Sequence, residues 1–298
     1  MTRLTYATRR SLLALAQCRA FVAQLAKAHP DLELVELQVV TSGDKIQDRP
    51  LSEVGGKGLW VKEIEEALLD GRADLAVHSI KDVPGVLPPG LMIACIPARE
   101  DPRDVLVSPR FESLAKLPSG AKLGTSSLRR AVSIARVRPD LQIAMIRGNV
   151  DTRLRKVDAG EFDAIVLARA GLVRLGLGAR ATEVLAPEVS LPAVGQGALG
   201  IECRADDAAT RARLAALHDE TAAVCVAAER GVLQALEGDC KTPLAAFAEK
   251  LEGGRIRLRA FVAEPDGKKL RQDEETVAWP ASEAQARGLG EAMGARLR

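Results

Sequence analysis

Strand-like and helix-like patterns of apolar residues alternate along the first hundred residues. Four segments are typical of strands: L-T-Y-A-T, 32–40, 73–78 and 91–97. Between the second and third of these, V-K-E-I-E-E-A-L-L-D-G spaces its apolar residues as a helix does and ends at Gly71. The alternation predicts an α/β layer with a largely parallel sheet.

Two further groups of elements follow. After E-D-P-R-D, strand and helix patterns alternate again up to D-A-I-V-L-A, which predicts a second α/β layer. E-D-P-R-D and L-P-A-V-G-Q-G are the expected hinges between the layers. Beyond residue 218 a long helix leads to strands separated at Gly253-Gly254 and Asp266-Gly267, and a last helix begins near Ser282. This third group predicts a small α+β domain with an antiparallel sheet.

The segment T-R-R-S-L-L-A-L-A-Q-C near the N-terminus has two interpretations. Twin arginines, an apolar run and a cysteine are typical of an export signal with a lipidation site. The apolar run from Leu12 to Ala16 spans only five residues, however, whereas a secretory core has about 7–15. Apolar residues continue beyond it at helical spacing, which favours an amphipathic helix starting near Ser11. No run approaches the about 18 apolar residues of a transmembrane helix.

The composition is that of a globular protein with few aromatic residues. Of 298 residues, 47% are hydrophobic, 28% charged and 3% aromatic, and the net charge is +2. This balance argues against a general nucleic-acid binder, because such proteins are strongly basic. Yet 30 of the 42 basic residues are arginine, whose rigid fork suits carboxylates and phosphates. A local anion site or GC-rich codon usage would each explain the excess.

Five cysteines lie far apart, and no C-x-x-C occurs. A disulfide framework or a structural zinc site is therefore disfavoured, and we expect a reduced, intracellular protein. One of them, Cys240, stands among turn formers in L-E-G-D-C-K-T-P. Three readings of it remain open on this evidence: an incidental residue, half of a disulfide, or a metal ligand. The five are Cys18, Cys95, Cys203, Cys225 and Cys240.

Arginines gather where strands of the second layer pass into helices. G-T-S-S-L-R-R puts Arg129 and Arg130 in the first turns of a helix, and R-G-N-V-D-T-R holds Arg147 and Arg153. The positive charge of arginine is unfavourable beside the positive end of the helix dipole, at the helix N-terminus. An anionic ligand would explain why arginines lie there. The alternative is a set of solvated arginines in surface salt bridges. With no nucleotide-binding loop in the sequence, a small polycarboxylate is the simplest ligand.

V-H-S-I-K-D-V-P at 77–84 ends a strand with three polar side chains close together. Asp82 could act as a general acid or base or stabilise a cation. Lys81 could form a Schiff base or pair with an anion, and Ser79 lies beside it. Asp82 could equally be a turn residue that caps its own backbone before proline.

Taken together, the motifs resemble the porphobilinogen deaminase family. The matches occur in order over nearly the whole chain: A-T-R-x-S, V-G-G-K-G-L, V-H-S-I-K-D-V-P, E-D-P-R-D, G-T-S-S-L-R-R, R-G-N-V-x-T-R, L-P-A-V-G-Q-G, G-I-E-C-R and L-E-G-x-C. The resemblance implies a transferase of tetrapyrrole (heme, porphyrin) biosynthesis. It would condense four porphobilinogen molecules head to tail, losing ammonia each time, onto a covalent dipyrromethane cofactor. Hydrolysis then releases hydroxymethylbilane.

The resemblance also implies roles for individual residues. Cys240 would carry one dipyrromethane through a thioether, and Asp82 would be the catalytic acid–base that stabilises a cationic pyrrole. The side chains that would hold the cofactor beside these two are Ser79, Lys81, Thr125, Ser127, Arg129, Arg130, Arg147 and Arg153. Those that would bind substrate are Arg9, Gln17, Arg147, Arg153, Arg174 and Gln196. No metal is expected.

The implied architecture has three domains. Domain 1 would span 1–98 and 198–217, domain 2 would span 103–192, and domain 3, with the cofactor cysteine, would span 220–298. Domains 1 and 2 would be doubly wound α/β lobes similar to those of periplasmic binding proteins. We expect a cytoplasmic monomer that hands its product to uroporphyrinogen-III synthase and binds neither nucleic acid nor membrane. A non-catalytic two-lobed anion-binding protein is the rival, but it leaves the Cys240 loop unexplained.

Several positions depart from the usual family pattern. Leu12 stands where proline is common, Ala16 where tryptophan is common, and Trp60 where phenylalanine is common. Arg169 falls in an apolar run, and Asp239 replaces glycine beside the cysteine. These departures bear on rate and cofactor loading and leave the acid and the thiol in place.

Overall fold

The computed structural model describes residues 2–45, 60–238 and 242–298. They form two compact units, Met1–Glu100 with Ala198–Val226, and Asp101–Gly197 with Ala227–Arg298. The chain crosses between the units within E-D-P-R-D and directly after L-P-A-V-G-Q-G, where the sequence predicts hinges. The finer division into three domains stays a prediction.

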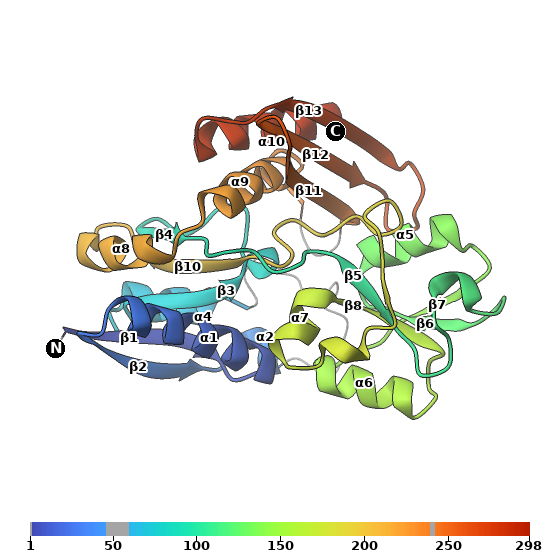
Figure 1. The fold of residues 1–298 in the computed structure, drawn as a ribbon, viewed down its shortest axis with the longest axis horizontal. Coiled ribbons are helices and arrows are strands. Elements are labelled where there is room, and N and C mark those ends of the chain that lie inside the picture. Colours follow the sequence, from blue (N-terminus) through green and yellow to red (C-terminus); the bar gives the residue numbers. More distant parts are fainter. Residues whose placement is uncertain (1, 46–59, 239–241) are drawn as a thin grey trace. The chain divides into compact units, whose positions relative to one another are not determined.

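The first unit is built around a five-stranded sheet in the order β2-β1-β3-β10-β4 (Figure 1). Strands β1, β2 and β3 are parallel, but β10 runs antiparallel to β3 and to β4, so the sheet is mixed. Its strands are β1 (Thr2–Arg9), β2 (Leu32–Val39), β3 (Leu75–Ser79), β4 (Leu91–Cys95) and β10 (Leu199–Arg204). Its helices are α1 (Leu12–Ala28), α2 (Ser42–Lys45), α4 (Lys62–Leu69), α8 (Ala208–Leu214) and the 3-10 turns η1 (Ile80–Asp82) and η4 (Ala215–Leu217).

Helices cover both faces of this sheet. On one face α1 buries Cys18, Phe21 and Leu25 against alternate residues of the strands. On the other face α4 buries Ile64 and Leu68 over a second apolar cluster. The predicted amphipathic helix near Ser11 is confirmed: the Ser11 hydroxyl accepts a hydrogen bond from the backbone N–H of Ala14, 3.3 Å away, and so caps α1.

The second unit contains a mixed five-stranded sheet in the order β7-β6-β8-β5-β9. Helix α5 packs on one face and α6 on the other (Figure 1). The strands are β5 (Asp104–Val107), β6 (Lys122–Gly124), β7 (Gln142–Ala144), β8 (Ala164–Ala168) and β9 (Glu183–Val184). The helices are α5 (Leu128–Val137), α6 (Val150–Asp158), α7 (Arg169–Arg174) and the 3-10 turns η2 (Leu114–Lys116) and η3 (Gly178–Arg180).

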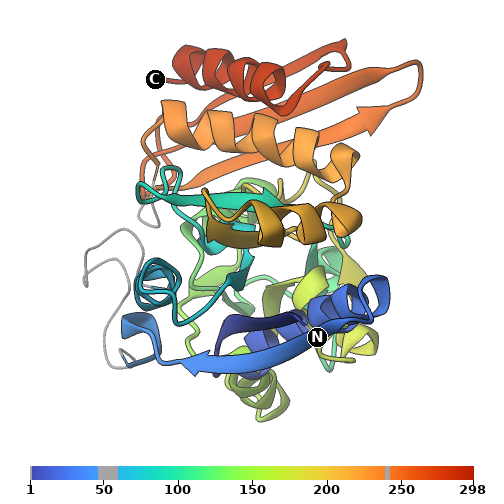
Figure 2. The ribbon, with the colours of Figure 1, turned by 90° about the vertical axis from the view of Figure 1, so that its left-hand side faces the viewer.

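The C-terminal part has the predicted antiparallel sheet, in the order β11-β12-β13. Its turns contain Gly253, Gly254 and Gly267, all with positive φ, as the hairpin signals require. Helices α9 and α10 lie side by side against this sheet (Figure 2). The elements are α9 (Glu220–Ala235), β11 (Leu244–Leu251), β12 (Arg255–Val262), β13 (Arg271–Ala278) and α10 (Glu283–Arg296).

The fold class expected from sequence, two α/β layers and a small α+β part with an antiparallel sheet, is confirmed by these topologies. The strand that the apolar pattern did not place is β10. It enters the first sheet from a hundred residues downstream and makes that sheet mixed. Within the described ranges, no helix has the length and apolarity needed to cross a membrane.

Candidate active site

A pocket of the first unit gathers four of the predicted site residues. Its lining includes Arg9 from the end of β1, Gln17 from α1, and Ser79 and Asp82 from the end of β3 and the turn after it. Lys81 is exposed and is not among the residues that line this pocket. The carboxyl ends of the parallel strands β1 and β3 therefore form one edge of the pocket, as expected for ligand sites in α/β sheets.

The turn that carries Asp82 is tied to its neighbours on several sides. The Ile80 backbone N–H donates to the carbonyl of Ala198 at 3.1 Å, and Val83 N–H closes the turn onto the Ile80 carbonyl at 3.0 Å. The Ile80 side chain lies directly over Gly200, where an added Cβ would meet its terminal carbons. A larger residue on β10 would therefore displace the Ile80 side chain beneath this turn.

Ser79 and Arg9 are held by side-chain contacts. The Gln17 amide donates to the Ser79 hydroxyl at 3.1 Å, which joins α1 to the end of β3. The Arg9 guanidinium lies over the Trp60 ring, 4.1 Å from its centroid. A larger indole face strengthens such a cation–π contact, which gives Trp60 a physical role at this position.

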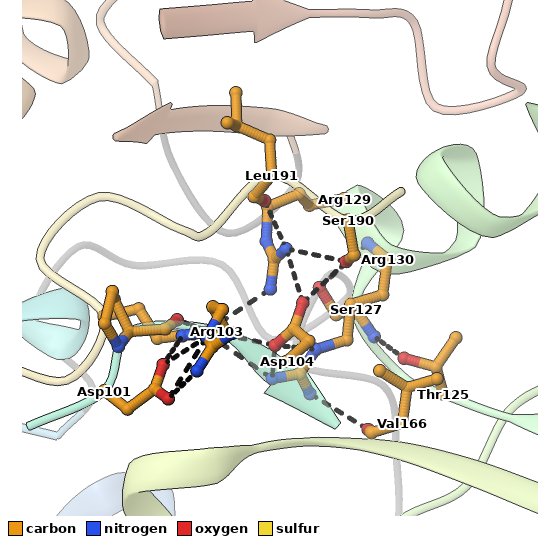
Figure 3. Close-up of polar contacts among 12 residues, drawn as sticks. Asp101, Arg103, Asp104, Thr125, Ser127, Arg129, Arg130, Val166, Ser190 and Leu191 are labelled. Atoms are coloured by element: carbon orange, nitrogen blue, oxygen red, sulfur yellow. Dashed lines mark hydrogen bonds and ion pairs between the residues drawn. The ribbon is translucent and has the colours of Figure 1, made fainter. Parts of the chain in front are cut away.

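In the second unit, Arg129 and Arg130 share one buried carboxylate (Figure 3). Arg129 Nη1 lies 2.8 Å from Asp104 Oδ2, and Arg130 donates to Asp104 Oδ1 from Nε at 3.0 Å and from Nη2 at 2.8 Å. Asp104 is fully buried, which alone would raise its pKa, but the attraction of both arginines holds that pKa well below its usual range. The carboxylate therefore stays ionised in the fold.

This network changes the interpretation of G-T-S-S-L-R-R. An anionic ligand was one reason to place arginines in the first turns of a helix, and Asp104 is an internal anion that supplies the same reason. The side chains of Arg129 and Arg130 are only 6% and 8% exposed. The Nε of Arg129 has no hydrogen-bond partner among the described residues.

Gln196 belongs to the same network. Its Nε2 donates to Asp104 Oδ1 at 2.8 Å and to the Pro102 carbonyl at 2.6 Å. Ser190 Oγ completes the ring of donors around the carboxylate at 2.7 Å from Oδ2. Asp104 and Ser190 were not identified from sequence. Asp104 is the last residue of E-D-P-R-D and directly precedes the apolar run V-L-V, and this position was a usable signal.

Arg153 lies in a crowded cationic environment. Burial first, and then repulsion from Arg130 and Arg147, lowers its pKa to about 10. Its Nε donates to the carbonyl of Gly148 at 2.8 Å, which fixes the guanidinium at the start of α6. Gly148 has a φ of 110° and contacts Thr152, so the loop before α6 depends on this glycine. A bound carboxylate would relieve the repulsion between these cations.

The remaining predicted residues of this unit lie near helix ends. Ser127 caps α5: its hydroxyl accepts from the Arg130 backbone N–H at 3.4 Å, and its own N–H donates to Thr125 Oγ1 at 3.2 Å. Arg174, at the end of α7, donates from Nη2 to the carbonyl of Gly197 at 2.7 Å. Arg169, which departs from the family pattern, begins α7 and pairs with Asp101 at 3.3 Å.

Comparison with known proteins places these features in a family. Residues 4–212 match the family model described as porphobilinogen deaminase, dipyromethane cofactor binding domain, and residues 223–298 match the model of the porphobilinogen deaminase C-terminal domain. The chain belongs to the porphobilinogen deaminase family. The predicted family resemblance is thereby confirmed.

Two relatives that match this chain over most of their length are named porphobilinogen deaminase. A porphobilinogen deaminase of Sorangium cellulosum (strain So ce56) is 62% identical, with 100% of this chain and 99% of that protein covered. A porphobilinogen deaminase of Syntrophotalea carbinolica (strain DSM 2380 / NBRC 103641 / GraBd1) is 54% identical, with 97% and 91% covered.

Similarity to solved structures is much weaker. A putative methionine-binding lipoprotein of Bacillus subtilis subsp. subtilis str. 168 has a TM-score of 0.44 and 14% identity, with 74% of this chain and 92% of that chain covered. At that similarity it says nothing about what this chain binds.

The residues of the porphobilinogen deaminase cofactor-binding domain fit dipyrromethane, whose two pyrroles carry acetate and propionate groups. Arg130 and Arg147 both lie close enough to Arg153 to repel it, and the buried Nε of Arg129 has no hydrogen-bond partner among the described residues. Asp104 neutralises only part of this charge. Carboxylates are the anions that arginine forks bind best, so the donor set suits the group.

The predicted anchor, Cys240, lies outside the described residues, as do Asp239 and Lys241. The other four cysteines are all buried. Burial raises the pKa of Cys18 and Cys95 to about 12, and burial followed by the charge of Asp207 raises the pKa of Cys203 to about 11. These three thiols stay protonated at neutral pH and are poor nucleophiles.

Proposed function

We propose that this protein is a porphobilinogen deaminase, a transferase that joins four porphobilinogen molecules head to tail and releases hydroxymethylbilane. The observation that carries the proposal is the 62% identity over the whole chain to a protein of that name, together with both family models. The buried arginines and the pocket around Asp82 support it.

Each condensation joins the aminomethyl carbon of one porphobilinogen to a free pyrrole α-carbon. The C–N bond breaks and ammonia leaves, a C–C bond forms, and the α-carbon loses one proton. The departure of ammonia leaves a cation spread over the pyrrole ring. We assign Asp82 to stabilise that cation and to accept the α-carbon proton, because among the described residues it is the carboxylate that lines the pocket of the first unit.

Arginine forks are assigned to the acetate and propionate groups of the pyrroles. Each charge-assisted hydrogen bond contributes about 1.5–3 kcal/mol, so several hold a large anion. Arg147 and Arg153 are the best candidates, because their mutual repulsion falls when a carboxylate binds. Arg9 and Arg174 would bind substrate in the same way. Arg129 and Arg130 would combine that role with their bonds to Asp104.

The dipyrromethane group, when bound through Cys240, supplies the pyrrole end to which the first porphobilinogen is joined. Ser79, Lys81, Thr125 and Ser127 would hold its carboxylates and pyrrole N–H groups. Gln17 and Gln196 would bind substrate and also support neighbouring side chains. Gln17 donates to Ser79, and Gln196 donates to the Asp104 carboxylate, which holds Arg129 and Arg130.

The cellular setting and the assembly belong to the same proposal. We infer a cytoplasmic monomer with three domains at 1–98 with 198–217, 103–192 and 220–298, which passes its product to uroporphyrinogen-III synthase. A thioether to Cys240 survives a reducing compartment, where a disulfide would not.

The decisive test is stoichiometry with purified protein and porphobilinogen. We expect ammonia and hydroxymethylbilane to appear in a ratio of about four to one at steady state, as follows from the atom balance of each condensation. Binding of porphobilinogen without release of ammonia would contradict the proposal and would favour an anion-binding protein.

A further inference from the structure

Three titratable side chains are buried together behind the pocket of the first unit. His78 on β3 lies with its Nε2 3.0 Å from Glu202 Oε2 on β10, and both residues act through their charge on Glu65 of α4. The residues are only 5%, 1% and 7% exposed, respectively. None of them has a part in the chemistry assigned above.

This group stands in an otherwise apolar layer. Helix α4 packs on the sheet through Ile64, Ala67 and Leu68, and the strands β1 and β4 present Ala7 and Leu91 to it. Among the residues that the structure describes, the charged or titratable groups that shift the pKa of Glu65 are Glu202 from β10 and His78 from β3.

The arrangement cannot readily hold both carboxylates ionised. One oxygen of Glu65 and one of Glu202 are buried without a hydrogen-bond partner in the described part of the chain. Burial first, and then the charge of Glu202, raises the pKa of Glu65 to about 7, while His78 opposes the rise. The group therefore keeps a proton that an exposed glutamate would have lost.

The same group reaches the pocket. His78 lines it together with Ser79 and Asp82, and Ser79 is the next residue along β3. The contact between His78 Nε2 and Glu202 holds the His78 ring in place. Because His78 lies near the end of β3, the same contact holds the strand end from which the turn with Asp82 begins.

We propose that Glu65, Glu202 and His78 form a buried acid–base chain that supports Asp82: it positions His78 and adds one negative charge behind the pocket when Glu65 releases its proton to solvent. His78 is a positioning residue in this chain. The inference rests on the proposed function, because the added charge matters where a cationic pyrrole forms.

The added charge has a predictable effect on rate. A buried negative charge behind the pocket stabilises a cation that forms in it, and we expect this to alter the rate on the order of threefold. Because the cation forms only during reaction, kcat changes and KM stays nearly constant. The wild type gains this factor as pH rises through about 7, and a protein without the titrating group does not.

Glu65→Gln tests this directly, with Glu66→Gln as the matched control on the exposed side of the same helix. At pH 6 we expect all three proteins to have similar kcat. At pH 8.5 the wild type and Glu66→Gln should exceed Glu65→Gln about threefold. A Glu65→Gln to wild-type ratio that stays constant from pH 6 to 8.5 would overturn the inference.

Histidine NMR supplies a readout that does not depend on activity. The chain has only three histidines, and His78→Gln assigns the His78 ring signals. We expect those signals to step near pH 7 in the wild type and in Glu66→Gln but not in Glu65→Gln. If the wild type itself shows no such step, the proposed acid–base chain of Glu65, Glu202 and His78 is rejected. A wild type that shows the step but forms no hydroxymethylbilane would instead reject the proposed function.

Discussion

Single side chains at this site are positioned mainly by residues next to them. Asp82 follows a turn that is held by Ile80, whose N–H bonds to Ala198 and whose side chain lies over Gly200. Ser79 is held by Gln17 in the same manner. A change to one of these supports would therefore move the carboxylate without removing it.

Asp82→Asn should leave substrate binding in place and remove most of the turnover. The amide keeps the shape but has neither the negative charge nor the ability to exchange a proton. We expect kcat to fall by about 10²–10⁴-fold, measured as product formation at saturating porphobilinogen in protein already loaded with cofactor. Asp70→Asn, an exposed position at the end of α4, is the control. A loss of less than about tenfold would assign this chemistry to another group.

Glu65 should make stability depend on pH in a defined window. Its pKa is about 7 in the fold and near 4.5 in the unfolded chain. Below pH 4.5 the folded and the unfolded protein both keep this proton. As pH rises toward and through 7, the free energy of unfolding of the wild type falls, because Glu65 ionises less readily in the folded state than in the unfolded chain. Glu65→Gln has no proton to lose, so its free energy of unfolding should rise relative to that of the wild type by up to about 3 kcal/mol between pH 4.5 and 8.

Urea unfolding at pH 5 and pH 8 measures this difference. Glu66→Gln, whose side chain is exposed on the same helix, should track the wild type at both values. If the difference in the free energy of unfolding between Glu65→Gln and wild type does not increase from pH 5 to pH 8, Glu65 is already ionised in the folded protein at pH 5.

At the scale of elements, the start of α5 and the crossing of α9 with α10 depend on tertiary partners. Two arginines in the first turn of α5 are stable because Asp104 on β5 lies against them. Helices α9 and α10 approach closely because Gly231, Gly290 and Gly294 have no side chains to hold them apart.

Arg130→Leu should destabilise the protein as well as weaken binding. Its guanidinium makes two of the bonds to the buried Asp104 carboxylate, and removing one partner of a buried ion pair typically costs about 3–5 kcal/mol. Arg136→Leu, on the exposed side of α5, should change the free energy of unfolding by less than about 1 kcal/mol. Equal effects of the two variants in urea unfolding would mean that Asp104 does not depend on Arg130.

Gly290→Ala tests the contact between α9 and α10. An added Cβ would clash with the carbonyl oxygen of Ala228, so the helices must separate. We expect a loss of about 1–3 kcal/mol in thermal or urea unfolding. Gly288→Ala on the same helix meets nothing within 4 Å and should instead stabilise α10 by about 0.5–1 kcal/mol. A neutral Gly290→Ala would show that the helices are not in close contact.

At the scale of the whole molecule, the chain passes between its two units at Glu100–Asp101, Gly197–Ala198 and within α9. Each unit contributes separate site residues: Asp82 in the first, and the Asp104 network with Arg153 in the second. The proposed cofactor cysteine follows α9, which begins in the first unit and ends in the second.

The intact protein should carry a covalent adduct. We expect its mass to exceed that of the 31.7 kDa chain by two linked pyrroles, with the added mass on the peptide that contains Cys240. Cys240→Ser should lack the adduct and the activity. Cys225→Ser, a buried position in α9, should retain both. Active protein with an unmodified Cys240 would disprove the assignment.

Most elements of this fold could be predicted from the sequence, because their signals are local. Ser11 and Ser282 cap helices where the sequence predicts helix starts, and glycines with positive φ lie in the turns between the hairpin strands. Strand β10 could not be paired in this way. Its apolar pattern allows a strand, but its neighbours β3 and β4 lie a hundred residues earlier, and no local property specifies such a pairing.

The sequence by itself determined the family and the excess of arginine, because motifs and residue types persist whatever the packing; it also motivates the prediction that Asp82 is the catalytic acid. Only the tertiary structure decided what those arginines touch. Asp104 neutralises Arg129 and Arg130 because β5 lies beside the start of α5. Burial under α4 first, and then the charge of Glu202, raises the pKa of Glu65, while His78 opposes the rise. Charge and burial act through distance, and distances between residues far apart in sequence exist only once the chain has folded.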